Sequence, residues 1–139
     1  MSPQVQVREF ELGNGAKYLC HPHHRNGNPN KSQWDLSEQR ELDLFGLAFE
    51  NQWLLDSVGW GVAKMNNTLE YLGVSTDRLT RLFIAKFVAT GTNWHGYPAD
   101  HQRNQQDIPA TAIQRKWLDD RVVPPSKIRK ISKGQPCSL

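Results

Sequence analysis

The residue types best suited to chemistry gather in the segment WHGYPADH at positions 94–101. Imidazole titrates near neutral pH, so His95 and His101 could serve as general base and general acid on a phosphodiester. That pairing predicts a small histidine-dependent nuclease or hydrolase. The chain has no glycine-rich phosphate loop, no G-x-S-x-G and no H-E-x-x-H, which are the usual marks of such enzymes. Catalysis is therefore an alternative here, and a non-catalytic protein is the first expectation.

The same segment also has a purely structural interpretation. Trp94 and Tyr97 could anchor a loop on the core, since aromatic side chains bury large areas. Gly96 and Pro98 could then fix the turns of that loop, and Asp100 could hydrogen-bond nearby backbone amides. In this interpretation the segment is an anchored loop within residues 91–108, where binding sites are disproportionately found.

A second group of candidate residues lies upstream, where Cys20 is followed by histidines at positions 21, 23 and 24. Thiolate and imidazole are the ligands that zinc prefers. The spacing does not match a zinc finger, because the chain has no C-x-x-C and its other cysteine is Cys137. We therefore expect no cofactor, with a zinc site at Cys20, His23 and His24 as the alternative.

Cations suggest a third chemistry, which is contact with nucleic acid. The run KIRKISK near the C-terminus carries Lys127, Arg129, Lys130 and Lys133 and no acidic residue. Such a run can supply salt-sensitive phosphate contacts, although it is also typical of a solvated helix face. The net charge of +3 is compatible with this partner without requiring it.

A helix-turn-helix from Met65 to Phe87 is the element that could present further cations. Gly73, with apolar residues before and after it, resembles the turn of that motif. The motif would aim Arg78 and Arg81 at DNA. Leu69 departs from the pattern, because a small residue usually stands there, and an ordinary packed helix pair has the same apolar spacing.

These residues need elements to position them, and the pattern predicts a helix-rich α+β fold. Residues 5–20 read as a β-hairpin around Gly13-Asn14-Gly15, and residues 21–32 as a loop. Periodic apolar residues favour a helical core over 33–90. The competing interpretation makes the apolar run 82–88 a central strand. The segment 109–134 predicts C-terminal helices broken by two prolines.

Length and composition predict one soluble domain. The chain has 139 residues, of which 37% are hydrophobic and 22% charged, as in ordinary globular proteins. No apolar stretch reaches membrane-spanning length and the first residues do not resemble a secretion signal. We therefore expect no membrane partner, a cytoplasmic location and free thiols at Cys20 and Cys137.

The function favoured by these patterns is a small non-catalytic binding protein that contacts nucleic acid through a basic face. The residues expected to make those contacts are Arg78, Arg81, Lys127, Arg129, Lys130 and Lys133. One alternative is a protein–protein interaction module or inhibitor with exposed tryptophan and tyrosine as interface anchors. The other is the histidine-dependent hydrolase described above.

Overall fold

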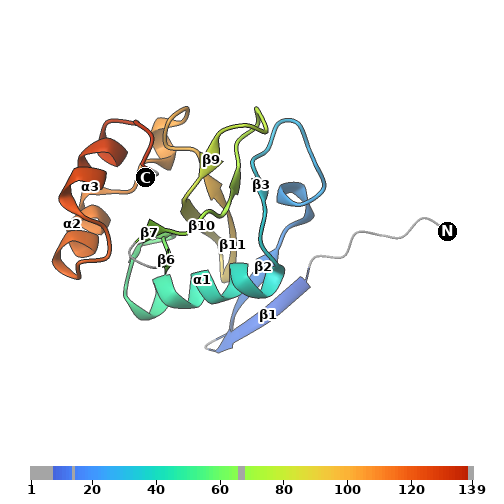
Figure 1. The fold of residues 1–139 in the computed structure, drawn as a ribbon. Helices are drawn as coiled ribbons and strands as arrows, with labels where there is room; N and C mark the ends of the chain where they lie inside the picture. The colour runs from blue at the N-terminus through green and yellow to red at the C-terminus, as the bar shows by residue number, and fades with distance from the viewer. Residues whose placement is uncertain (1–7, 14, 66–67, 138–139) are drawn as a thin grey trace.

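The fold is organised around one large sheet, seen in a computed structural model that describes residues 8–13, 15–65 and 68–137. The sheet is six-stranded, with the order β1-β2-β11-β10-β5-β4 (Figure 1). In that order its strands are Arg8–Gly13, Ala16–Cys20, Asn93–Ala99, Ile84–Thr90, Val58–Gly61 and Leu54–Leu55. All neighbours are antiparallel except β2 and β11, which run parallel.

Helix α1 (Glu38–Glu50) covers one face of this sheet, with Ser37 as its N-cap. The ring of Phe45 on α1 lies 5.2 Å from Phe87 of β10 and 5.4 Å from Trp94 of β11, measured between centroids. Side chains alternate across a strand, so the residues next to Trp94 and Phe87 point to the opposite face. His95 and Tyr97 therefore lie on the face away from α1.

The segment predicted as a loop at 91–108 begins with strand β11 instead, and Gly96 does not form a turn. Gly96 lies opposite Phe87 in the register of β10 and β11. A Cβ atom at Gly96 would stand 2.6 Å from Phe87 Cδ1 and 2.5 Å from the Tyr18 hydroxyl. The glycine is needed because the aromatic core under α1 comes this close to the strand.

Two smaller sheets lie beside the six-stranded sheet. A three-stranded sheet joins β3 (Gln33–Trp34), β8 (Gly73–Val74) and β9 (Arg81–Leu82), and a two-stranded one joins β6 (Lys64–Met65) and β7 (Thr68–Leu69). Two single turns of 3-10 helix, η1 (Pro22–His24) and η2 (Gln105–Asp107), lie in the connecting segments. Figure 1 shows β3 and β9 beside the upper end of β11.

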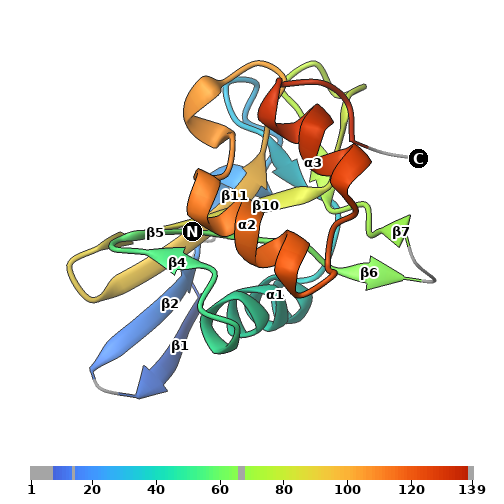
Figure 2. The same cartoon turned by 90° about the vertical axis from the view of Figure 1, so that its left-hand side faces the viewer.

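The C-terminal helices α2 (Thr111–Asp119) and α3 (Pro125–Ser132) pack together at one side of the molecule (Figure 2). Trp117 of α2 lies edge-on to Trp53, with ring centroids 5.9 Å apart. The apolar side of α3 buries Ile128 and Ile131. The predicted pair of helices after Pro109, separated by the prolines at 124 and 125, is confirmed.

The expectation of a helix-rich fold is wrong. Within the predicted helical core of residues 33–90, the structure forms α1 and then strands, and 65–87 holds no helix among its described residues. The helix-turn-helix is therefore wrong as well. Strand β10 is buried on both faces, and such a strand has a continuous apolar run that resembles a buried helix. The competing interpretation of 82–88 as a central strand is correct from Ile84 onward, since β10 runs from Ile84 to Thr90 while Leu82 belongs to β9.

Other expectations for the fold are confirmed. The N-terminal hairpin is present from Arg8 to Cys20, while positions 5–7 lie outside the described residues. Gly15 in its turn has φ +76°, which glycine adopts without strain. Cys20 and Cys137 are buried and are not joined in a disulfide. In the part of the chain that the structure describes, no helix is long and apolar enough to cross a membrane.

Candidate functional site

A polar cleft opens where three distant segments meet beyond the end of β11. The loop before β3, the turn between β8 and β9, and the segment from Tyr97 to Asp107 form its walls. Its volume is about 310 Å³, and its lining is His24, Asn30, Lys31, Ser32, Ser75, Thr76, Tyr97, Asp100, Arg103, Asn104, Gln106 and Asp107. Almost every lining side chain carries a hydrogen-bonding group, so the cleft suits a polar ligand.

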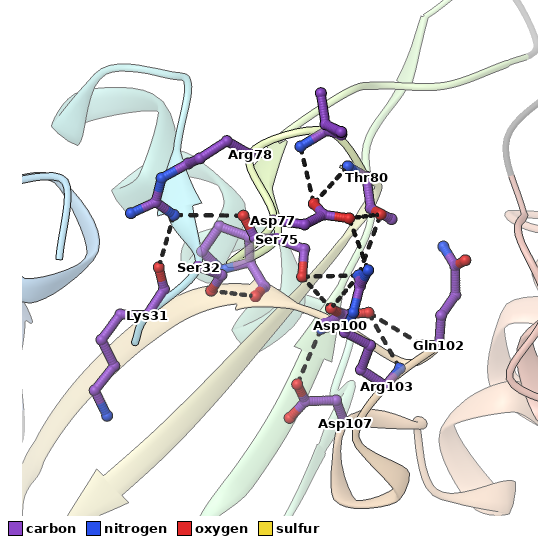
Figure 3. Close-up of polar contacts among 12 residues, drawn as sticks. Lys31, Ser32, Ser75, Asp77, Arg78, Thr80, Asp100, Gln102, Arg103 and Asp107 are labelled. Carbon is purple, nitrogen blue, oxygen red and sulfur yellow. Dashed lines mark hydrogen bonds and ion pairs between the residues drawn. The ribbon is translucent and has the colours of Figure 1, made fainter. Parts of the chain in front are cut away.

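Arg103 holds two of these walls together (Figure 3). Its Nη1 donates to Ser75 Oγ at 3.2 Å and to Asp100 Oδ2 at 3.3 Å. Its Nη2 donates to Asp77 Oδ2 at 2.7 Å, across the turn between β8 and β9. The Ser75 hydroxyl donates directly to Asp100. The charge of Arg103 is thus matched by carboxylates, and its main effect is to fix the shape of the cleft.

Asp77 shapes the turn itself. Its carboxylate accepts the backbone N–H groups of Leu79 and Thr80, each at 2.8 Å, and the Thr80 hydroxyl at 2.6 Å. These hydrogen bonds, together with the one from Arg103, hold the pKa of Asp77 well below its ordinary value. The turn therefore carries a fixed negative charge under the guanidinium of Arg103.

Asp107 forms the floor of the cleft. It accepts from the Tyr97 hydroxyl at 3.1 Å, from the Asp100 backbone N–H at 2.9 Å and from Lys86 Nζ at 3.5 Å. Burial, with the Asp107 charge close by, raises the pKa of Tyr97 far above neutrality. Tyr97 therefore stays protonated, donates to Asp107 and keeps its oxygen lone pairs for another donor.

His24 presents a neutral imidazole to the site. The side chain is 9% exposed, and its Nδ1 lies 2.9 Å from the Ser32 carbonyl oxygen. A carbonyl only accepts, so Nδ1 carries the hydrogen and Nε2 is left as an acceptor. Burial lowers the pKa of His24 to about 4, so the ring is uncharged at neutral pH. It stacks on Tyr97 with centroids 5.1 Å apart.

Two cations lie at the Asn28–Lys31 side of the cleft, which we call its mouth: Lys31 lines the cleft, and Arg78 lies outside the lining with its guanidinium on the Lys31 backbone carbonyl. Arg78 has φ 61° in the turn between β8 and β9, and its guanidinium donates to the carbonyls of Asn28 at 2.7 Å and Lys31 at 3.0 Å. Within the described residues neither Lys31 nor Arg78 forms an ion pair with a carboxylate. Lys31 and Arg78 therefore bring positive charge to the mouth. Inside, the carboxylates of Asp77 and Asp100 share Arg103 and that of Asp107 pairs with Lys86, which leaves one net negative charge.

A second hollow adjoins the cleft, because His24 lines both. Its volume is about 440 Å³, and its lining is Leu19, His21, His23, His24, Thr90, Asn93 and His95. The rings of His21 and His95 meet edge to face at 4.9 Å, and His23 lies 6.3 Å from His21. Burial lowers the pKa of both His21 and His95. Among the described residues no three His, Cys, Asp or Glu side chains are grouped so that they could hold a metal ion.

The two histidines predicted as an acid–base pair are separated. His95 contacts His21, whereas His101 is buried and its Nε2 lies 2.6 Å from the Gln135 carbonyl near the C-terminus. Of the predicted anchors, Trp94 packs under α1, while Tyr97 and Asp100 line the cleft.

The predicted cations fall in two places. Arg78 and Arg81 lie on the β8–β9 hairpin, where the Arg81 guanidinium sits 4.8 Å from the Tyr71 ring centroid. Arg129, Lys130 and Lys133 are exposed on and beside α3, away from the cleft lining. Lys127 points inward instead, with 5% exposure, so the cationic run does not form one exposed face. A helix buries every third or fourth residue, and Lys127 falls on the stripe of Ile128 and Ile131.

Sequence reasoning missed several residues of the cleft, above all Ser75 and Asp107, and gave Arg103 no part in a binding cleft. Their contacts are with residues far away in the chain, so no local pattern could mark them. One signal was available: Arg103 follows Asp100 by three positions and pairs with it, as a cation and a carboxylate in one turn can do.

Comparison of the chain with protein-family models, with curated proteins and with solved structures finds no match. The function must therefore be argued from the site itself.

Proposed function

We propose that this protein binds single-stranded nucleic acid, with one nucleotide seated in the polar cleft. The observation that carries the proposal is the charge arrangement of the cleft. Its inner charges are paired, whereas Lys31 and Arg78 at the mouth face no carboxylate among the described residues. A ligand that fits has hydrogen-bonding edges for the interior and negative charge for the mouth.

A nucleotide combines these two properties. The Watson–Crick edge of a base offers donors and acceptors together, and the lining supplies matching groups on Asn30, Asn104 and Gln106. His24 Nε2 adds an acceptor that is fixed in place by the bond from Nδ1 to Ser32. A base can enter such a pocket only when it is unpaired, so the proposal is limited to single strands.

The phosphates on either side of the seated nucleotide would meet Lys31 and Arg78. The cleft also favours this surface over α3, because Arg129, Lys130 and Lys133 are not among the residues that line it. Contacts of this kind release counterions, so affinity must fall as salt is added.

The test is a titration of a fluorescein-labelled mixed-sequence oligonucleotide, as single strand and as duplex, over a series of salt concentrations. We compare the wild type with Lys31→Gln/Arg78→Gln and with Arg129→Gln/Lys133→Gln. Both double variants remove two positive charges, so the second controls for net charge. Glutamine retains hydrogen-bonding capacity at Arg78, which limits the structural cost of the change.

We expect tighter binding of the single strand. We also expect the Lys31/Arg78 variant to reduce the slope of log K against log salt by about 1.4, or about 0.7 for each lost phosphate contact. The α3 variant should leave binding near the wild-type level. Preference for duplex, or an equal or larger loss in the α3 variant, would refute binding at the cleft.

A second candidate function rests on the adjoining hollow, where His21 and His95 are in direct ring contact. One neutral and one protonated imidazole can remove a proton from a 2′-hydroxyl and deliver one to the leaving 5′-oxygen of RNA. Because burial lowers the pKa of both His21 and His95, we expect this pair of protonation states only on the acidic side of neutrality. The activity is assayed as release of a 2′,3′-cyclic phosphate from a dinucleotide. Loss of this product in His95→Asn, with the fold and melting temperature retained, would support RNA cleavage by this pair through transesterification. An unchanged rate in that variant would exclude the pair.

A further inference from the structure

A second surface of the molecule, with the opposite chemistry, lies between α1 and the edge strand β1. It is a groove of about 500 Å³, lined by Phe10, Glu11, Leu42, Asp43, Phe45, Gly46, Leu47, Phe49 and Glu50. Strand β1 pairs with β2 on one side only and stands at the end of the sheet order. The groove therefore runs along one flank of α1 at the border of the sheet, as the position of α1 beside β1 shows (Figure 1).

The bottom of the groove is apolar and partly exposed. Phe49 is 50% exposed and Leu47 is 38% exposed, and both stand on α1. Leu42, Phe45 and Phe49 follow the three- and four-residue steps of one helix flank, with Phe45 and Phe49 rings 6.0 Å apart. Leu42, Phe45 and Phe49 therefore form one contiguous apolar strip, and such a strip marks an interaction surface more often than scattered apolar residues do. Leu47 lines the groove from the other side of Asp43 and Glu50, about 160° round the helix from Phe49.

The rim of the groove is acidic. Glu11, Asp43 and Glu50 are exposed, and no lysine, arginine or histidine is among the described residues that line it. The chain as a whole has a net charge of +3, so the negative charge of this rim is local and opposite to the net charge of the protein. The acidic rim repels phosphate, so the groove does not suit the nucleic-acid ligand proposed for the cleft.

We propose that this groove binds a cationic amphipathic helix of a partner protein. The apolar side of such a helix would cover Leu42 and Phe49, and its lysines or arginines would meet Asp43 and Glu50 beside that strip. The fit rests on charge complementarity between the acidic rim and a basic ligand. A helix suits the groove because the apolar wall is itself a helix flank, and ridges of one helix pack into the grooves of another.

The experiment uses the full chain and two labelled synthetic helices of about 18 residues, long enough to span the length of α1. Both carry the same leucine face, but one has lysine and the other glutamate on its polar face. Fluorescence anisotropy gives the affinity for each peptide at low and moderate salt. The variant Asp43→Lys/Glu50→Lys reverses the rim, and Asp119→Lys/Asp120→Lys reverses two exposed acids on and just after α2 as the matched control.

We expect the wild type to bind the lysine helix at least about tenfold more tightly than the glutamate helix. The rim variant should reverse this preference, while the control variant should keep it. Phe49→Ser should weaken both peptides, since it removes apolar area without a change of charge. Equal affinity for the two helices, or an equal effect of the control variant, would overturn the proposal.

Sedimentation of the protein alone gives a second readout. A monomer over the working concentrations agrees with a groove that is open to a partner. A dimer that Phe49→Ser dissociates would overturn the proposal, because a second copy of this chain would then occupy the groove.

Discussion

The cleft and the groove lie in one small protein and differ in how their polar groups are used. In the cleft the carboxylate of Asp100 is paired with Arg103 and that of Asp107 with Lys86, whereas Lys31 and Arg78 at the mouth pair with no carboxylate among the described residues. In the groove the apolar side chains of Leu47 and Phe49 stay in contact with water. A modest net charge therefore conceals two surfaces of opposite sign, and composition alone could suggest only the basic one.

Both surfaces depend on one buried carboxylate, Glu41 of α1. Its Oε2 accepts the Tyr18 hydroxyl at 2.6 Å, and its Oε1 accepts Arg25 Nη2 at 2.7 Å. Arg25 belongs to the loop that leads to the cleft wall, and it also donates to the Leu36 carbonyl at 2.5 Å. Burial raises the pKa of Glu41, while the bonds from Tyr18 and Arg25 oppose that shift. The helix of the groove and the loop of the cleft meet at this residue.

The largest expected effect follows from breaking that junction with Arg25→Met. The variant removes the Arg25–Glu41 ion pair and leaves the Glu41 carboxylate buried without a compensating charge. We expect this to lower the free energy of unfolding by about 3 kcal/mol. Both surfaces should weaken together, as measured by urea denaturation and by the two binding assays. Arg40→Met is the control, since Arg40 pairs with Glu70 in a more exposed position and its loss should cost below about 1 kcal/mol. Equal costs for the two variants would contradict the assigned role of Glu41.

The next effect should be confined to the cleft. Asp107→Ala removes the acceptor of Tyr97, Lys86 and the Asp100 backbone, and unpaired buried polar groups of this kind cost about 2 kcal/mol. Nucleic-acid binding should fall while binding of the lysine helix is unchanged. Asp43→Ala, on the exposed side of α1, should do the reverse and alter stability by less than about 0.5 kcal/mol. Loss of both kinds of binding in Asp107→Ala would mean that the two surfaces are not independent.

A third effect appears on acidification. His24 has a pKa of about 4 in the folded protein against 6.5 ordinarily. Between pH 6.5 and pH 4 His24 is protonated in the unfolded chain but neutral in the folded chain. Its contribution to stability is therefore complete above pH 6.5 and is lost as the pH falls toward 4. The shift corresponds to about 3 kcal/mol at most.

The measurement is the urea unfolding free energy of His24→Asn and wild type across that pH range. Asparagine can donate to the Ser32 carbonyl without titrating, so the variant should show a shallower pH dependence. His23→Asn, at an exposed position of the same turn, serves as the control. Parallel pH profiles for His24→Asn and wild type would contradict burial of a neutral His24.

The smallest effect on stability is expected in the groove. Leu47→Gln changes a side chain that is already 38% exposed, so unfolding free energy should change by about 1 kcal/mol or less. Binding of the lysine helix should nevertheless weaken. A large loss of stability would show that Leu47 belongs to the core and does not serve a binding surface.

Local signals in the sequence predicted some elements and not others. The hairpin ending at Cys20 and the helices after Pro109 were predictable because glycine and proline mark their turns and ends. The strands between Val58 and Ala99 were not. The apolar run of β10 is buried on both faces, and a pattern without alternation fits a helix equally well. Strand β11 contains glycine, proline and polar residues, which are typical of a loop.

The candidate site was predictable only where its residues stand close together in the chain. Tyr97 and Asp100 drew attention in this way, as did the histidines at positions 21–24. The partners that give them a role, Ser75 and His95 among them, come from distant segments. The contact between His21 and His95 follows from the pairing of β2 with β11 and not from their spacing in the sequence.

The parallel pairing of β2 with β11 has a consequence for how this chain folds. On the side of β2 away from β1, the partners of Lys17, Tyr18 and Leu19 are residues 93 to 95. This edge of the hairpin therefore stays unpaired until most of the chain has been synthesised. Closing so long a loop is slow, because its entropy must be lost before the contacts form. During synthesis the hairpin therefore carries an open strand edge that other chains can pair with. A truncation before β11 should aggregate where the full chain remains monomeric.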